Sequence, residues 1–171
     1  LHPRLGGPPV IAASLAAAQA QLGHEVHLVS SVPDDPSVVQ GLSPHIEGVR
    51  ISSIGNPRRC EKFFACQTRK VIAPLMEGAS IIHLHNVWEP MLAATASLAR
   101  KRRVPYVVLI NGMLDPWSLA QSSLKKKFAL ALYARRMLNG AAALQVGNAA
   151  EIAGLAPLGL KPRMFELANG V

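Results

Sequence analysis

Apolar residues along this chain form short runs that alternate with longer segments at helical spacing. The short aliphatic runs predict strands at residues 25–30, 49–54, 80–85, 106–110, 142–146 and 164–167. Segments with an apolar face predict helices at 8–22, 61–76, 90–102 and 124–138. Parallel strands need helical crossovers, so this alternation favours an α/β fold with a doubly wound, mostly parallel sheet.

Local signals predict where two of the helices begin or end. In the first helix, Ile11, Leu15, Ala18 and Leu22 share one face, which we expect to be buried, and Gly23 supplies the C-terminal stop. Near the C-terminus, Asn148 and Glu151 have the spacing of an N-terminal helix cap.

The segment after the strand at 106–110 is the first candidate for a binding site. Ligands of open α/β sheets bind outside the carboxyl ends of the strands. Asn111 lies there, and Gly112 can take a positive φ and let the backbone approach a ligand. Met113, Asp115 and Trp117 could form a pocket wall. The alternative is a plain strand-to-helix connection in which Trp117 anchors the core.

The strand at 80–85 carries two histidines on the same side, because His83 and His85 are two residues apart. No third ligand has a convincing spacing, so we expect no metal site. His85 is nearer the carboxyl end and, with Asn86 and Trp88, is the better candidate for a pocket. His83 is expected to be a core histidine with its hydrogen bonds satisfied.

The charge balance indicates an anionic partner. The chain has a formal net charge of +8, and its sequence pI is about 10.1. Only 5% of residues are aromatic and no recognition motif is present, so we do not expect nucleic-acid binding. Cys60 and Cys66 fit no metal or redox spacing and are interpreted as free thiols of a reducing cytoplasm.

Two basic runs are candidates for contact with an anionic membrane surface. The second run is the three lysines at 125–127, which would fall in the first turn of a helix, where the helix dipole disfavours cations. A solvated helix face is the alternative. No secretory signal or membrane span is evident, so we expect a cytoplasmic protein, in the membrane case peripheral on the inner face. The runs are Arg100, Lys101, Arg102 and Arg103, and Lys125, Lys126 and Lys127.

Four segments together resemble the N-terminal domain of GT-B glycosyltransferases of the large retaining family 4 (group 1). Members of this type act in bacterial exopolysaccharide and lipopolysaccharide synthesis. The segment that begins at Asn111 is similar to the family motif His-Gly-Met-Leu-(Asp/Glu)-Pro-Trp. The segments are Gly6-Gly7-Pro8-Pro9 with Gly23-His24-Glu25-Val26, Ile82-His83-Leu84-His85-Asn86-Val87-Trp88, Asn111-Gly112-Met113-Leu114-Asp115-Pro116-Trp117, and Glu166-Leu167-Ala168-Asn169-Gly170-Val171.

The resemblance implies a Rossmann-like domain that binds the acceptor of a sugar transfer. The donor would be a nucleotide sugar and the acceptor a saccharide or lipid-linked saccharide, with no further cofactor. The backbone at Gly6 and Gly7 could approach the diphosphate. The acceptor or donor-sugar pocket would comprise His85, Asn86, Trp88, Asn111, Gly112, Met113 and Asp115.

The chain departs from the family pattern in two respects. Asn111 stands where the family commonly has histidine, and an amide cannot titrate near neutral pH. Residues 1–171 would form one domain that lacks most of its first strand, and the donor-binding C-terminal domain with its paired glutamates would lie outside it. We therefore expect the isolated chain to be inactive. A non-catalytic glycan- or nucleotide-binding module is the alternative.

Overall fold

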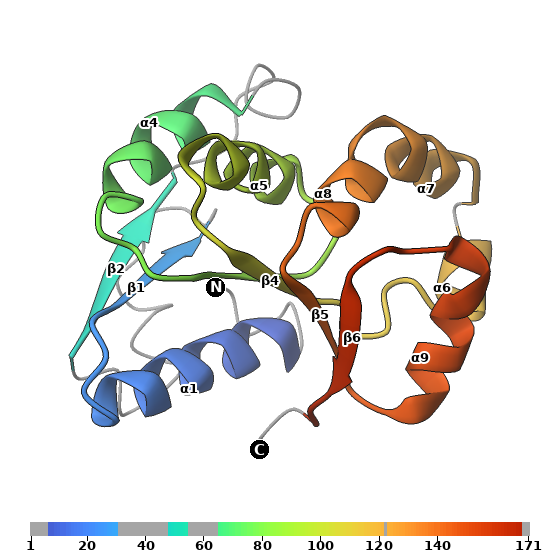
Figure 1. Cartoon of the computed structure of the whole chain (residues 1–171), viewed down its shortest axis with the longest axis horizontal. Coiled ribbons are helices and arrows are strands. Elements are labelled where there is room, and N and C mark those ends of the chain that lie inside the picture. Colours follow the sequence, from blue (N-terminus) through green and yellow to red (C-terminus); the bar gives the residue numbers. More distant parts are fainter. Residues whose placement is uncertain (1–6, 31–47, 55–64, 122, 169–171) are drawn as a thin grey trace. The chain divides into compact units, whose positions relative to one another are not determined.

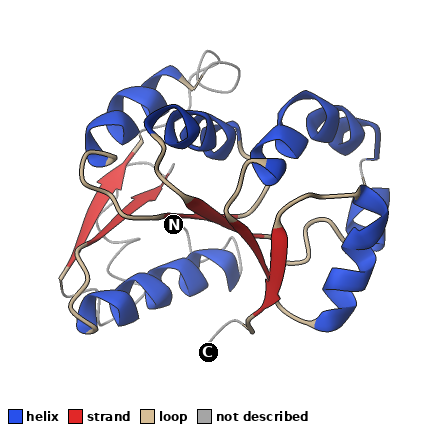
Figure 2. Cartoon of the chain, viewed as in Figure 1, coloured by secondary structure: helices blue, strands red, loops and turns tan. Residues whose placement is uncertain are grey.

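The computed structural model describes residues 7–30, 48–54, 65–121 and 123–168. These residues belong to two compact units, one formed by residues 1–60 and 169–171 and the other by residues 61–168. Figure 2 shows that the described residues contain both helices and strands. All strand pairs among the described residues are parallel, which confirms the predicted α/β class.

The first unit contains one helix and two strands. The helix α1 (Gly7–Gln21) is followed by β1 (Val26–Ser30) and β2 (Val49–Ser53), which pair in parallel, and α1 packs against both strands. Gly23 has a φ of +88°, so it ends the helix as predicted. Of the two glycines predicted to approach a diphosphate, Gly6 lies outside the described residues and Gly7 is the first residue of α1.

The buried face of α1 differs from the predicted one. Ala12, Ala13, Ala16 and Ala17 are buried, whereas Leu22 is 78% exposed. Both faces are apolar, and spacing alone does not distinguish them. The small alanine side chains leave little distance between the helix backbone and its neighbours, and Ala20 lies 3.5 Å from where a Cβ at Gly48 would stand.

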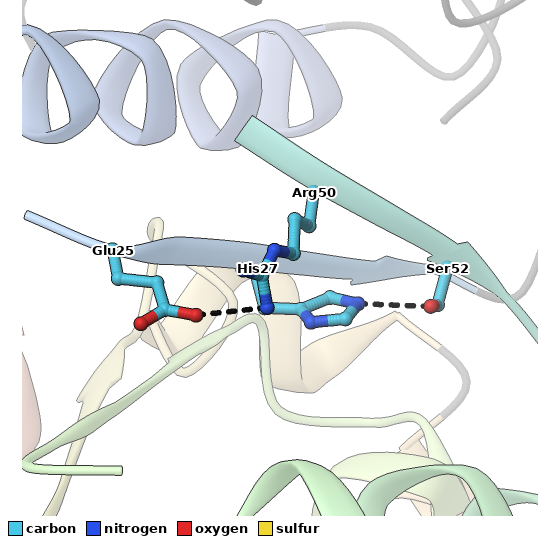
Figure 3. Close-up of polar contacts among 4 residues, drawn as sticks. All are labelled: Glu25, His27, Arg50 and Ser52. Atoms are coloured by element: carbon cyan, nitrogen blue, oxygen red, sulfur yellow. Dashed lines mark hydrogen bonds and ion pairs between the residues drawn. The ribbon is translucent and has the colours of Figure 1, made fainter. Parts of the chain in front are cut away.

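Polar side chains connect the two strands of this unit. His27 and Ser52 form a hydrogen bond of 2.9 Å between Nε2 and Oγ, and Glu25 forms a 2.8 Å ion pair with Arg50 (Figure 3). The hydrogen bond and the ion pair are both exposed to solvent, so these two contacts contribute little to stability.

The second unit has a four-stranded parallel sheet in the order β3-β4-β5-β6. Consecutive strands are neighbours, and right-handed crossovers place the connecting helices on one face of such a sheet. Figure 1 shows α5, α8 and α9 following one another around the sheet. The strands are β3 (Ile82–His85), β4 (Tyr106–Leu109), β5 (Ala143–Val146) and β6 (Arg163–Glu166). The main helices are α4 (Cys66–Leu75), α5 (Pro90–Arg102), α7 (Ser123–Ala129), α8 (Arg135–Asn139) and α9 (Ala149–Leu155).

Three helical details depart from the prediction. Ala65 has a φ of +48° directly before α4, so this helix begins at Cys66, and residues 61–64 lie outside the described part. A short helix, α6 (Pro116–Ala120), lies in the segment after the strand at 106–110, where no helix is predicted. The helix predicted at 124–138 is interrupted by a π-helical segment, η2 (Leu130–Ala134), between α7 and α8.

Tyr106 is one of the largest buried side chains of the second unit and is 1% exposed. Its hydroxyl donates a 2.7 Å hydrogen bond to the Met137 carbonyl and accepts one of 3.0 Å from Arg100 Nη1. These bonds connect β4 to α8 and α5 and satisfy a buried phenol. The surrounding core consists of aliphatic residues of β4, β5 and α8, including Val108, Leu138 and Leu144.

Candidate functional site

The candidate site lies at the carboxyl ends of β3 and β4. These strands are paired in register, with His85 opposite Leu109, so the loops that follow them leave the sheet side by side. Asn111 Nδ2 donates a 3.3 Å hydrogen bond to Asn86 Oδ1. The structure therefore brings together two pocket residues that are 25 positions apart in the sequence.

The backbone at this edge of the sheet has an unusual conformation. Asn86, Asn111 and Gly112 have φ values of +84°, +54° and +67°, so all three lie in the left-handed region. The positive φ predicted for Gly112 is confirmed. Asparagine and histidine are both enriched in this conformation among residues other than glycine, which gives Asn111 a backbone role in addition to any role of its amide.

Glu151 is a central residue of the site that the sequence pattern marked only as part of a helix cap. Its Oε1 accepts a 2.6 Å hydrogen bond from Gly112 N–H, and its Oε2 accepts one of 2.7 Å from Gly147 N–H. Asn148 Oδ1 accepts a 2.8 Å hydrogen bond from Glu151 N–H, which confirms the predicted helix cap. The buried carboxylate thus joins the loops after β4 and β5 to the start of α9.

The two histidines of β3 face the same side, and their ring centroids are 4.5 Å apart. Burial, together with a smaller effect of charge on His83, lowers the pKa of His85 to about 4. Burial also lowers the pKa of His83, although a hydrogen bond with the Gln145 side chain opposes this shift. Both rings are therefore neutral at pH 7.

The expectation that His83 is fully satisfied is wrong. Among the described residues, its buried Nε2 has no hydrogen-bond partner, and the same is true of His85 Nδ1. Such groups cost free energy unless something pairs with them. No group of three or more metal-ligating side chains occurs among the described residues, so these rings carry no metal assignment.

Glu89 is a second site residue that the sequence did not reveal. Burial raises the pKa of its carboxyl group, while hydrogen bonds from its own backbone and from the Asn86 side chain partly offset that rise. Its Oε2 is buried, and the part of the chain that the structure describes offers it no hydrogen-bond partner. Asn86 therefore accepts a hydrogen bond from Asn111 and lies close to the Glu89 carboxyl group, whose Oε2 has no donor among the described residues.

Trp88 connects this site to the helices that follow β4. Tyr133 donates its hydroxyl to the Trp88 carbonyl at 2.5 Å, and Lys126 Nζ lies 5.7 Å from the centre of the indole ring. Lys126 also donates to the carbonyl and the hydroxyl of Ser118. The Lys126 ammonium is thus directed at Trp88 and α6.

The remaining predicted residues have different environments. Met113 and Asp115 are half-buried after Gly112, and Asp115 precedes α6 without capping it through its side chain. Trp117 is 75% exposed, so the alternative in which it anchors the core is wrong. In the first basic run, Arg100 contacts Tyr106 and Arg102 contacts the Ala73 carbonyl and Glu77.

Lys101 and Arg103 are exposed. Arg103 directly follows α5, and its φ of +58° ends the helix. The side chains of Lys125 and Lys127 lie outside what the structure describes. Cys66 is an exposed free thiol, as expected, and Cys60 lies outside the described residues. No helix in the described ranges is sufficiently long and apolar to cross a membrane.

Comparison with known families gives this site its context. Residues 6–170 match the family of glycosyl transferase 4-like domains. The chain belongs to this family. The likeness inferred from the four sequence segments is therefore confirmed, and this glycosyltransferase domain is of the N-terminal, Rossmann-like type found in GT-B enzymes. A comparison with curated protein sequences finds no match.

Proposed function

We propose that this glycosyltransferase domain binds the acceptor, a saccharide or a lipid-linked saccharide, in a transfer from a nucleotide sugar. The observation that carries the proposal is the Asn111–Asn86 hydrogen bond beside the buried Glu89 carboxyl group, at the carboxyl ends of β3 and β4. Sugar hydroxyls both donate and accept hydrogen bonds, and amides, carboxylates and neutral imidazoles provide the complementary groups.

The chemistry of the site supports recognition by orientation. Asn111 is a neutral amide and cannot serve as a general base. The His85 ring is neutral at pH 7, and its buried Nδ1 has no partner within the described ranges. A hydroxyl that reached His85 Nδ1 or Glu89 Oε2 would satisfy an atom that is otherwise unpaired. Such groups fix the position of the attacking hydroxyl, which is a large part of catalysis between two bound substrates.

The family relationship supports the rest of the proposal. A retaining transfer would require the nucleotide sugar to be held by a second domain, while the backbone at Gly6 and Gly7 approaches the diphosphate. The chain of residues 1–171 alone would then form no product. We place the protein in the cytoplasm, where nucleotide sugars would supply the donor.

Steady-state kinetics of the full-length protein test the acceptor role. Glu89→Gln keeps the size of the side chain but replaces the unpaired carboxylate oxygen, so it should raise KM for the acceptor and leave KM for the donor unchanged. Glu77→Gln changes a surface glutamate of the same unit and is the matched control. Equal changes in both KM values would contradict acceptor binding here. Glycan binding without any transfer would favour the non-catalytic module.

A further inference from the structure

An exposed apolar stripe runs along the helix that contacts the site. Leu124 and Phe128 of α7 and Leu132 of η2 are 81%, 70% and 67% exposed. Residues four apart lie on one side of a helix, so the three side chains form a continuous row, which we call the apolar stripe. Trp117, at 75% exposure, lies on α6, which packs against α7.

Large apolar side chains are exposed singly on most proteins, but a row of them marks an interaction surface. The π-helical segment places Ala134, Met137 and Leu138 in the core while Leu132 stays outside. The helix therefore already has a complete buried face, and the apolar stripe is additional to it.

The charges around the apolar stripe indicate its partner. No aspartate or glutamate occurs between Asp115 and Glu151, whereas Lys125, Lys126, Lys127, Arg135 and Arg136 all lie in this segment. Arg135 and Arg136 are exposed on α8, the continuation of the same helix. An apolar row accompanied only by cations is typical of helices that lie in the headgroup region of an anionic bilayer.

We propose that the apolar stripe inserts into the surface of an anionic lipid bilayer and docks this domain on the membrane. The leucines and the phenylalanine would enter the acyl boundary, and the basic residues would contact lipid phosphates. In the basic run at the end of α5, Arg100 and Arg102 are engaged in contacts within the domain, as Lys126 and Arg135 are in the segment of the apolar stripe. The exposed apolar row, and not the number of free cations, is therefore what favours the stripe for this role.

Docking would also determine where the candidate site lies. The helix that carries the apolar stripe contacts the loop after β3 through Tyr133 and Lys126, both of which interact with Trp88. A bound stripe would therefore hold this loop close to the headgroups. This consequence rests on the proposed function, and it favours a lipid-linked acceptor over a free saccharide.

Co-sedimentation of the full-length protein with vesicles tests the docking without an activity assay. The vesicles contain phosphatidylcholine alone or phosphatidylcholine mixed with phosphatidylglycerol. The protein should bind the anionic vesicles preferentially and less strongly at high salt. Leu124→Ser, Phe128→Ser and Leu132→Ser combined should reduce binding on the order of tenfold or more.

The matched control combines Leu22→Ser, Ile81→Ser and Leu167→Ser, which removes three other exposed apolar side chains. This control should bind as the unchanged protein does, and circular dichroism should show both triple variants folded. Trp117 fluorescence should shift to the blue with anionic vesicles, and Trp117→Phe should remove that shift.

Several outcomes would overturn the proposal. They are an absence of vesicle binding, equal binding to neutral and anionic vesicles, and an equal loss in the control triple variant. A dimer in solution that the stripe substitutions abolish, without vesicle binding, would assign the apolar stripe to a second copy instead. None of these outcomes depends on whether the domain binds an acceptor, so docking and the proposed function can fail separately.

Discussion

Glu151 accepts a hydrogen bond from the backbone of Gly112, 39 positions earlier in the chain, at 2.6 Å. The same carboxylate accepts from Gly147, so one side chain determines how two loops leave the sheet. Glu151 is 7% exposed, and water cannot easily replace these bonds. The geometry of the candidate site thus depends on a residue that is outside the predicted pocket.

Replacing Glu151 with Gln should destabilise the domain. An amide offers only one acceptor oxygen, so one of the two backbone N–H groups would lose its partner at a cost of about 1–3 kcal/mol. Chemical denaturation should show this loss in the free energy of unfolding. Glu166→Gln, at an exposed position of β6, should change stability little. Similar values for the two variants would show that the Glu151 bonds are not important for folding.

Two substitutions at Asn111 should separate its backbone role from its side-chain role. Alanine at a φ of +54° costs about 1–2 kcal/mol of stability, whereas glycine adopts this conformation readily. If the amide orients a substrate, both variants should lower kcat/KM, by an amount equivalent to a loss of about 1–3 kcal/mol of transition-state stabilisation. Thermal unfolding and kinetics of the full-length protein measure the two effects. Full activity in Asn111→Gly would leave the residue with a conformational role alone.

The burial of His85 predicts a dependence of stability on pH. The ring has a pKa of about 4 when folded and an ordinary value of 6.5, so between these values the unfolded chain binds more protons. The free energy of unfolding should therefore fall as the pH is lowered from about 7 towards 4, by at most about 1.4 kcal/mol per pH unit for this one proton.

His85→Gln should flatten this dependence, and the exposed His24→Gln is the control for loss of an imidazole. The raised pKa of Glu89 acts in the opposite direction, since its carboxyl group gains a proton at higher pH when folded. NMR titration of the His85 ring resolves the two groups. A midpoint near 6.5 would contradict the burial of this ring.

Gly140 should not tolerate a methyl group. A Cβ at this position would stand 2.7 Å from the Tyr106 hydroxyl and 2.8 Å from Arg100 Cδ. Gly140→Ala should reduce stability by about 1–3 kcal/mol through overpacking. Gly154→Ala is the matched control, because its nearest neighbour is at 3.4 Å, and it should be neutral or slightly stabilising. Equal melting temperatures for the two variants would contradict the packing described for Tyr106.

The sequence predicted those parts of the fold that depend on local chemistry. The helix α5 has the predicted bounds, the strands lie within a few residues of the predicted runs, and Asn148 caps α9 as its spacing implied. These features follow from apolar periodicity, proline and capping residues, all of which act over one or two turns.

The sequence did not predict features that depend on distant partners. The prediction of which face of α1 is buried was wrong, because this helix has two apolar faces and spacing alone does not distinguish them. The burial of Glu89 and the contact of Glu151 with Gly112 leave no local pattern, since each depends on a loop from another part of the chain. Nothing in the run at 124–138 distinguishes a continuous helix from one with a π-helical turn.

The left-handed backbone at Asn111 has a consequence for how this site can evolve. The family motif that this segment resembles has histidine at this position, and asparagine and histidine both tolerate the positive φ that the loop requires. Their codons differ by one base, so a lineage can exchange one for the other without an intermediate that distorts the loop. The same mutation exchanges a group that titrates near neutral pH for one that does not. The shape of this loop therefore keeps a direct genetic route open between two kinds of site chemistry.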